Sequence, residues 1–245
     1  MKSVAVFSVK GGVGKTTLAV NLGFVAATQS ARRTLLWDLD AQGAATYALR
    51  VDARPGLSAR KVFAGDAELQ SLIQPSRYER LDMLPADRSL RHLDRQLGDD
   101  DKAKRLKKML RALDLDYDRV LLDCPPGLTE LADQVFRAVD VLVVPMLPSP
   151  LSMRAYDQLR EHLAREPRKG LIVLPVFTMV DRRRTLHKRT VDGVVGALTI
   201  PYASAIEQMG VDQAPIGART PGSVPARAFG AVWTAIETAL AGQGA

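Results

Sequence analysis

A glycine-rich turn between an apolar segment and a helical segment constrains the fold of this chain more than any other feature. Residues 4–9 are mostly apolar and predict a buried strand, and a helical pattern rich in Ala, Leu and Val covers 17–27. The turn between them reads Lys10, Gly11, Gly12, Val13, Gly14, Lys15, Thr16, Thr17. A strand, a glycine-rich turn and a helix in this order are the context of a phosphate-binding loop, so we expect an α/β fold that binds a nucleotide here.

The residue types in the turn fit the phosphates of a nucleoside triphosphate. Glycine lets the backbone wrap closely around phosphate oxygens, and the start of the following helix supplies N–H donors and positive potential. Lys15 is placed to reach the β- and γ-phosphates, and the Thr16 hydroxyl is placed to coordinate Mg²⁺. The predicted nucleotide contacts are Gly11, Gly12, Val13, Gly14, Lys15, Thr16 and Thr17. A tight turn alone would not need Gly-Lys-Thr at a strand-to-helix junction.

Two acidic motifs follow other apolar segments. Asp38 and Asp40 come directly after the segment 34–37, at a strand end where open α/β sheets bind ligands. A role as turn or N-cap residues is the alternative for these aspartates. Asp123 ends the apolar segment 120–122 and is predicted to hold Mg²⁺ through water. The residues that follow, 125–127, read Pro-Pro-Gly and suit a stiff switch loop that senses the γ-phosphate.

The remaining pattern predicts a doubly wound, mostly parallel sheet with helices on both faces. The expected strands are 3–8, 34–37, 81–84, 120–122, 141–146 and 171–177. Helical patterns alternate with them, for example over 106–113, and their near-continuous apolar character fits strands covered on both sides. The acidic run 99–101 is expected to begin a helix. The chain of 245 residues is interpreted as one domain, 1–245.

Composition narrows the function classes. Cys124 is the only cysteine, so an intrachain disulfide or a cysteine-held cluster is excluded, and we expect this side chain to be a small buried one. The net charge of +7 and a pI near 9.7 favour a polyanionic partner. The apolar N-terminal run is too short for a signal peptide or a membrane span, and we expect a cytoplasmic protein.

A second lysine, Lys10, opens the phosphate loop, and this loop resembles the signature-lysine (deviant Walker A) ATPases, which include the ParA partition ATPases, MinD and the nitrogenase iron protein. The resemblance implies a P-loop ATPase that uses ATP and Mg²⁺, and an ATP-dependent homodimer in which Lys10 acts in trans on the partner's phosphates. The stretch 38–46 resembles a ParA-type motif, which implies that Asp40 orients the attacking water and that Asp38 supports the loop or the metal. The implied catalytic residues are therefore Lys10, Lys15 and Asp40. The stretch 176–181 lies where the family contacts the nucleotide base and places Met179 in the binding site.

A basic cluster follows the last of these strands, at the start of a predicted helix. Its candidate nucleic-acid contacts are Arg182, Arg183, Arg184, Lys188 and Arg189, with His187 among them. Such a cluster contacts phosphates without reading bases and predicts nonspecific, salt-sensitive DNA binding. A solvated helix face is the alternative interpretation. By family resemblance, the ATP state binds the nucleoid, and a ParB-like or adaptor protein stimulates hydrolysis while a plasmid, chromosome locus or protein cluster is segregated or positioned.

Other members of the superfamily have other functions. A MinD-like membrane switch uses a basic amphipathic C-terminal helix, whereas 229–240 has no Lys or Arg after Arg227, so no membrane is expected and this helix is predicted to pack on the sheet. A nitrogenase-type reductase needs two cysteines per subunit to hold its cluster. This chain has one, Cys124, so that function is excluded. A protein-directed switch and an ATP-dependent small-molecule ligase remain alternatives.

Overall fold

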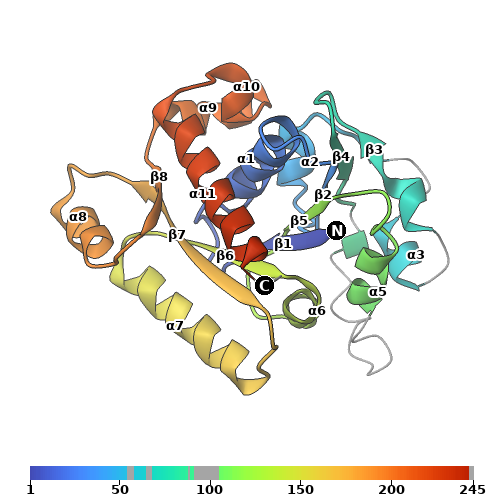
Figure 1. Ribbon diagram of the computed structural model, residues 1–245, viewed down its shortest axis with the longest axis horizontal. Helices are drawn as coiled ribbons and strands as arrows, with labels where there is room; N and C mark the ends of the chain where they lie inside the picture. Colours follow the sequence, from blue (N-terminus) through green and yellow to red (C-terminus); the bar gives the residue numbers. More distant parts are fainter. Residues whose placement is uncertain (54–57, 65–67, 88, 91–104, 243–245) are drawn as a thin grey trace.

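The computed structural model describes residues 1–53, 58–64, 68–87, 89–90 and 105–242 of the chain (Figure 1). Its centre is a sheet with the strand order β3-β4-β2-β5-β1-β6-β7-β8. The strands are β1 (Lys2–Val6), β2 (Thr34–Asp38), β3 (Gln74–Pro75), β4 (Leu81–Leu84), β5 (Arg119–Asp123), β6 (Val141–Met146), β7 (Ile172–Val180) and β8 (Leu198–Pro201). Neighbouring strands pair in parallel, except that β3 is antiparallel to β4. The expected doubly wound, mostly parallel sheet is confirmed.

Helices follow most of the strands. They are α1 (Lys15–Thr28), α2 (Ala44–Ala48), α3 (Ala59–Ala64), the 3₁₀ helix η1 (Leu69–Leu72), α5 (Arg105–Arg111), α6 (Glu130–Ala138), α7 (Pro150–Arg165), α8 (Thr185–Asp192), α9 (Ser204–Asp212), α10 (Ile216–Arg219) and α11 (Val224–Ala241). Among these helices, none is long and apolar enough to span a membrane, a statement that covers the described part of the chain.

The two faces of the sheet bury separate cores because side chains alternate along each strand. Val4 and Val6 of β1 face the core built with α1, α9, α10 and α11, whereas Ala5 and Phe7 face the core built with α5, α6 and α7. Figure 1 shows α1 and α11 on one side of the sheet and α6 and α7 on the other. The predicted helices on both faces are therefore present.

The C-terminal helix α11 packs as predicted. Its apolar residues Phe229, Val232, Trp233, Ile236 and Leu240 are buried in the core that it shares with α1. The indole Nε1 of Trp233 donates a hydrogen bond to Ser30 Oγ at 2.8 Å. The apolar face of this helix is thus occupied by the fold itself.

The six predicted strands are all present, but β3 and β8 were not predicted. β3 is only two residues long and contains Pro75. β8 is four residues long and includes Thr199 and Pro201, so neither segment carries a strong apolar signal. Over 106–113, α5 ends at Arg111, although Leu113 is fully buried as its helical spacing predicts. The acidic run 99–101 lies outside the described residues.

The position of β1 determines where a ligand binds. β1 lies between β5 and β6. The chain passes from β1 to β2 on the β5 side, and it later crosses from β5 to β6 on the other side of β1, so the strand order reverses here. The crevice at the carboxyl ends of the strands around such a switch point is the usual ligand site of open α/β sheets. The loop after β1 opens into this crevice.

Candidate active site

The glycine-rich loop joins β1 to the start of α1. Gly14 is the N-cap of α1 and has φ +84°, and Gly12 has φ +72°, so both need the left-handed conformation that glycine adopts readily. A Cβ added at Gly11 or Gly12 would meet no atom within 4 Å, which leaves open space over the exposed loop backbone. This space and the free N–H groups at the start of α1 fit a phosphate chain.

Lys15 is buried at the first position of α1. Its Nζ donates a weak hydrogen bond to the carbonyl oxygen of Lys10 at 3.4 Å. Burial lowers the pKa of Lys15, while the nearby carboxylates of Asp123 and Asp40 act in the opposite direction. The ammonium therefore lies between the loop and the acidic side of the site, where phosphate oxygens would supply the missing hydrogen-bond acceptors.

Asp123 ends β5 on the strand next to β1 and is fully buried. Both of its carboxylate oxygens are enclosed and lack a well-formed hydrogen bond within the described residues. Burial, followed by the charge of Asp38, raises the pKa of Asp123 well above its usual range, whereas Thr16 and Lys15 lower it. A buried carboxyl group without partners is costly unless a cation or donor completes it.

These residues fit Mg²⁺ held jointly with nucleotide phosphates. In the described residues, no group of three or more His, Cys, Asp or Glu side chains could hold a metal by itself. Mg²⁺ in phosphate-binding sites is usually bound through one or two protein groups, waters and substrate phosphates. The hydroxyl of Thr16 and the carboxylate of Asp123 are the groups that would hold it, and its charge would polarise the transferred phosphoryl group.

Asp38 and Asp40 have different surroundings although they are two residues apart. The Oδ2 atom of Asp38 accepts hydrogen bonds from the backbone N–H of Thr46 at 2.9 Å and from its hydroxyl at 2.7 Å. Burial raises the pKa of Asp38 to about 6 in spite of these bonds. Asp38 thereby ties the end of β2 to α2, and its predicted role toward the loop or the metal stays a prediction.

Asp40 lies closer to solvent and fixes a turn. Its Oδ1 accepts the backbone N–H of Gln42 at 2.9 Å, and its carbonyl oxygen accepts that of Gly43 at 2.8 Å. The turn interpretation of this residue is therefore realised, and its second carboxylate oxygen, Oδ2, accepts no hydrogen bond in the described structure. The predicted role in orienting water stays a prediction.

The segment after Asp123 leads directly into α6. Cys124 is buried, as predicted for a small apolar side chain, and burial raises the pKa of its thiol well above the usual value. Gly127 has φ +97°, and Thr129 caps α6 by accepting the N–H of Ala132. The Pro-Pro-Gly segment thus connects the metal side of the site to a helix start.

A small cavity of about 70 Å³ lies beside the phosphate loop, between the carboxyl ends of β7 and β8. Met179 and Gly14 both line it, and the buried Thr178 hydroxyl ties β7 to the loop by donating to Val13 O at 2.8 Å. Met179 has φ +53°, an uncommon value for a residue with a side chain. The lining also includes Ile200 and Tyr202 of the β8 region, which the sequence did not single out because β8 carries a weak strand signal.

The basic cluster lies directly beyond Met179, around α8. Figure 1 shows α8 at the periphery of the molecule, beyond β7 and β8. Arg183 forms a two-pronged ion pair with Asp181, and Arg182 pairs with Asp192 at 3.3 Å. Arg184, Lys188 and Arg189 are exposed and have no ion pair within the described structure.

His187 does not belong to this exposed charge. Its ring is buried, and its Nδ1 accepts the backbone N–H of Asp181 at 3.1 Å. The sequence groups His187 with the basic residues, but the structure places its ring away from their exposed surface. The side chain faces inward because helical spacing from the exposed Arg184 and Lys188 turns it toward the core.

The strand, glycine loop and helix, with a buried acid at the end of the neighbouring strand, define a P-loop nucleotide-binding protein. A family model described as an AAA domain matches residues 1–168. The chain is 31% identical over 195 residues to a virulence plasmid ParA family protein of Chlamydia psittaci, and this match covers 78% of this chain and 74% of the relative. It is 32% identical over 202 residues to the sporulation initiation inhibitor protein Soj of Bacillus subtilis, and this match covers 79% of this chain and 78% of the relative. The chain belongs to the ParA family of P-loop ATPases.

Solved structures support the same assignment. The septum site-determining protein MinD of Pyrococcus horikoshii, complexed with Mg-ADP, is 25% identical and superposes over 100% of this chain and 98% of its own with a TM-score of 0.80. A cobyrinic acid a,c-diamide synthase of Mycobacterium smegmatis with bound ATP analogue and magnesium is 29% identical over 93% and 91%, with a TM-score of 0.78. McdA of Cyanothece, in an ATP complex, superposes over 97% of this chain and 96% of its own with a TM-score of 0.86. Its identity of 18% means that this comparison shows similarity of the fold alone.

Family membership confirms several sequence predictions. The P-loop fold, the ATPase class, and ATP with Mg²⁺ as ligands are as expected. The structure brings Lys10, Lys15, Thr16, Asp38, Asp40 and Asp123 to one edge of the sheet. The individual roles of these residues and of the basic cluster remain predictions.

Proposed function

We propose that this partition or positioning ATPase is a nucleotide-operated switch on DNA. ATP closes a homodimer across the two nucleotide sites, and the ATP-bound dimer binds duplex DNA without regard to sequence. Hydrolysis, stimulated by a ParB-like or adaptor protein, releases it. The chain acts as one domain in the cytoplasm and on the nucleoid, where it segregates or positions a plasmid, a chromosome locus or a protein cluster.

The surroundings of Lys10 support dimer closure. Lys10 is partly exposed at the mouth of the phosphate loop, next to the exposed Gly11 and Gly12. Its ammonium has no hydrogen bond or ion pair in the described structure, whereas Lys15 in the same loop is buried. A free cation at this position is available to stabilise charge on the phosphates of a second subunit, as an arginine finger does.

The observation that carries the DNA proposal is the short connection between the nucleotide pocket and the basic cluster. Met179 lines the pocket, and the exposed cations begin three residues later at Arg182. A change at the nucleotide is therefore transmitted to the cluster through the end of a single strand, β7. Arg184, Lys188 and Arg189 are the free cations of this surface and fit phosphate contacts.

Equilibrium binding to a random-sequence duplex tests the proposal. Binding should be tight and salt-sensitive with a slowly hydrolysed ATP analogue and weak with ADP, measured by fluorescence anisotropy across a salt series. Replacing Arg184, Lys188 and Arg189 together by Ala should lower the slope of log K against log salt by about 3, since each phosphate contact contributes about 0.9.

The matched control removes the same charge elsewhere. Lys107, Lys108 and Arg111 are exposed on α5 and can be replaced by Ala together. This control should keep the salt slope of the unaltered protein. If both triple variants lost the same amount of salt slope, the effect would come from the net charge of the protein and not from the position of the cluster. If the protein bound no DNA in either nucleotide state, the DNA proposal would be wrong.

A small-molecule ligase is the second candidate, because the diamide synthase of Mycobacterium smegmatis matches nearly the whole chain at 29% identity. Such an enzyme releases ADP only when a carboxylic acid substrate is present and does not depend on DNA. ADP release measured with a panel of small acids, with and without duplex, distinguishes the two. A MinD-like membrane switch is less well supported because the apolar face of α11 is buried in the core.

A further inference from the structure

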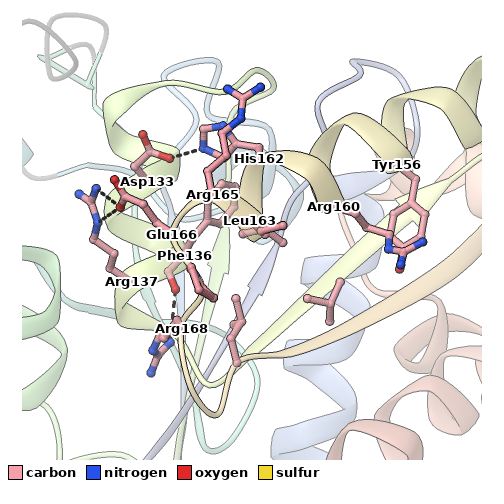
Figure 2. Close-up of a pocket in the computed structure, with 14 residues that line it drawn as sticks. Asp133, Phe136, Arg137, Tyr156, Arg160, His162, Leu163, Arg165, Glu166 and Arg168 are labelled. Atoms are coloured by element: carbon pink, nitrogen blue, oxygen red, sulfur yellow. Dashed lines mark hydrogen bonds and ion pairs between the residues drawn. The ribbon is translucent and has the colours of Figure 1, made fainter.

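A second, larger hollow lies on the α6 and α7 side of the sheet, away from the phosphate loop. It has a volume of about 400 Å³ and lies among α6, the second half of α7, the turn after α7 and the start of β7 (Figure 2). The phosphate loop follows the carboxyl end of β1, whereas Leu171 and Val173 of the hollow lie at the amino end of β7. The hollow is therefore separate from the nucleotide site.

The hollow exists because α7 covers the sheet incompletely. Of the sixteen residues of α7, only Ser152, Ala155 and Leu159 are buried. Leu171 and Val173, which face this side of the sheet, are only partly buried, whereas Phe177 farther along β7 is nearly completely buried. The space between the end of α7 and the sheet therefore has an apolar floor that no side chain fills.

The lining of the hollow has more arginine side chains than carboxylates to pair with them. Arg137 pairs with Glu166 at 2.6 Å, and His162 Nε2 lies 2.6 Å from Asp133 Oδ1. Figure 2 shows both pairs at one end of the hollow and Tyr156 with Arg160 at the other. These two pairs use both acidic side chains of the lining.

Three arginines of the lining remain. Within the described structure, no ion pair joins Arg160, Arg165 or Arg168 to a carboxylate, although the charge of Asp140 acts on Arg168. Arg168 is partly buried and donates a long hydrogen bond to Phe136 O at 3.4 Å; burial lowers the pKa of its guanidinium, while the nearby carboxylate of Asp140 acts in the opposite direction. Arg165 in the last turn of α7 suits the helix dipole, but Arg160 lies a turn earlier and Arg168 lies beyond the helix, so the dipole does not explain the set.

We propose that this hollow is a binding site for a small organic anion, a molecule with a flat apolar body and a carboxylate, phosphate or sulfonate group. Its volume is within the range of small-ligand pockets. Leu163, Leu171 and Val173 would cover the apolar body, with Phe136 and Tyr156 also in the lining. A free guanidinium group at the rim would bind the anionic group, because arginine matches carboxylate and phosphate geometry with two parallel hydrogen bonds.

The size and position of the hollow favour a small molecule over a nucleic acid. A duplex would reach the exposed Arg160 and Arg165 at the rim but leave the apolar floor and the partly buried Arg168 without contacts. A compact ligand can cover the apolar floor and still reach a cation at the rim. The site is independent of the DNA surface proposed at α8.

A fluorescence titration with 1-anilinonaphthalene-8-sulfonate tests the proposal, because this dye combines an aromatic body with one anionic group. The full chain is saturated with Mg-ADP first, so that the nucleotide pocket is filled. We expect one dye per chain with micromolar affinity. N-phenyl-1-naphthylamine, which lacks the sulfonate, should bind at least about tenfold more weakly, as expected when a charge-assisted hydrogen bond is lost.

Substitutions at the rim assign the binding to this hollow. Replacing Arg160 and Arg165 by Gln should weaken dye binding at least about tenfold. The control variant, Arg154→Gln with Lys107→Gln, removes the same charge from exposed residues outside the hollow and should stay within about twofold of the unaltered protein. Because all four positions are exposed, both variants should keep the far-ultraviolet circular dichroism of the fold.

Three results would overturn the proposal. They are an absence of saturable dye binding, equal affinity for the charged and uncharged dyes, and equal affinity in the Arg160/Arg165 variant. Displacement of the dye by a duplex oligonucleotide whose own binding disappears in the same variant would instead assign these arginines to a nucleic-acid surface.

Discussion

Asp38 and Asp123 are register partners at the carboxyl ends of the neighbouring strands β2 and β5, and both side chains are fully buried. Burial raises the pKa of Asp38 to about 6, and burial together with the charge of Asp38 raises that of Asp123 further above its usual range. Two buried carboxyl groups side by side store unfavourable electrostatic energy in the nucleotide-free protein. A bound cation would relieve it.

The first prediction concerns pH. Because the folded-state pKa of Asp38 is above its unfolded value of 3.8, the folded protein binds this proton more tightly, and the group's contribution to stability falls as pH rises from about 4 to about 6. The change amounts to about 3 kcal/mol. Asp38→Asn should therefore gain stability relative to the unaltered protein between pH 4 and pH 7, measured by urea unfolding without nucleotide. Asp52→Asn, at an exposed position, should show no such gain.

The second prediction separates binding from hydrolysis. Lys15→Ala should lower ATP hydrolysis at least about a hundredfold, because a phosphate ligand is lost, as measured by phosphate release. Asp40→Asn keeps an oxygen that can accept the Gln42 N–H, so it should fold and bind ATP normally yet hydrolyse it poorly and accumulate as an ATP-bound dimer in light scattering. If Asp40→Asn abolished nucleotide binding, the residue would be structural.

The third prediction concerns the cavity that Met179 lines, which is the predicted base pocket. Met179→Gly removes the side chain beside Gly14 and relaxes a backbone with φ +53°, so the variant should be at least as stable as the unaltered protein. ATP should bind several-fold more weakly, whereas inorganic tripolyphosphate, which lacks a base, should bind unchanged in calorimetry. Equal weakening of both ligands would place Met179 outside the base pocket.

The fourth prediction concerns Asn21, a buried polar residue of α1. Its Oδ1 accepts the backbone N–H of Ile216 at 2.8 Å, and its Nδ2 donates to Thr17 O at 2.7 Å. Asn21→Leu would leave the Ile216 N–H buried without a partner and should cost about 1–3 kcal/mol in urea unfolding. Thr234→Ala on the exposed surface of α11 should change stability by less than about 0.5 kcal/mol.

The fifth prediction compares two helical glycines. A Cβ at Gly217 would lie 2.7 Å from the ring of Phe24, whereas a Cβ at Gly210 would meet nothing within 4 Å. Gly217→Ala should destabilise the fold by about 1–3 kcal/mol, and Gly210→Ala should be neutral or stabilising by up to about 1 kcal/mol. Adding Phe24→Leu should cost less in the Gly217→Ala background than alone, because it removes the clash. Additive losses in a thermal or urea series would contradict the steric explanation.

The nucleotide site was predictable because its parts are local in sequence. A phosphate loop needs glycines, a lysine and a hydroxyl within eight residues, and the strand ends at Asp38 and Asp123 are marked by apolar runs. The inward orientation of His187 was not anticipated because a run of cationic residue types does not say which of them a short helix turns toward the core.

The sequence by itself determined the alternation of strands and helices, the loop from Lys10 to Thr17 and the acids that end β2 and β5, because periodicity and turn chemistry act over a few residues. Only the tertiary structure decided that Asp38 and Asp123 are neighbours and that Asn21 accepts a hydrogen bond from the backbone of Ile216. It also decided that α7 leaves a hollow with arginines at its rim beside the start of β7. These relationships join residues far apart in the chain, and they depend on strand order and helix packing, which no local pattern specifies.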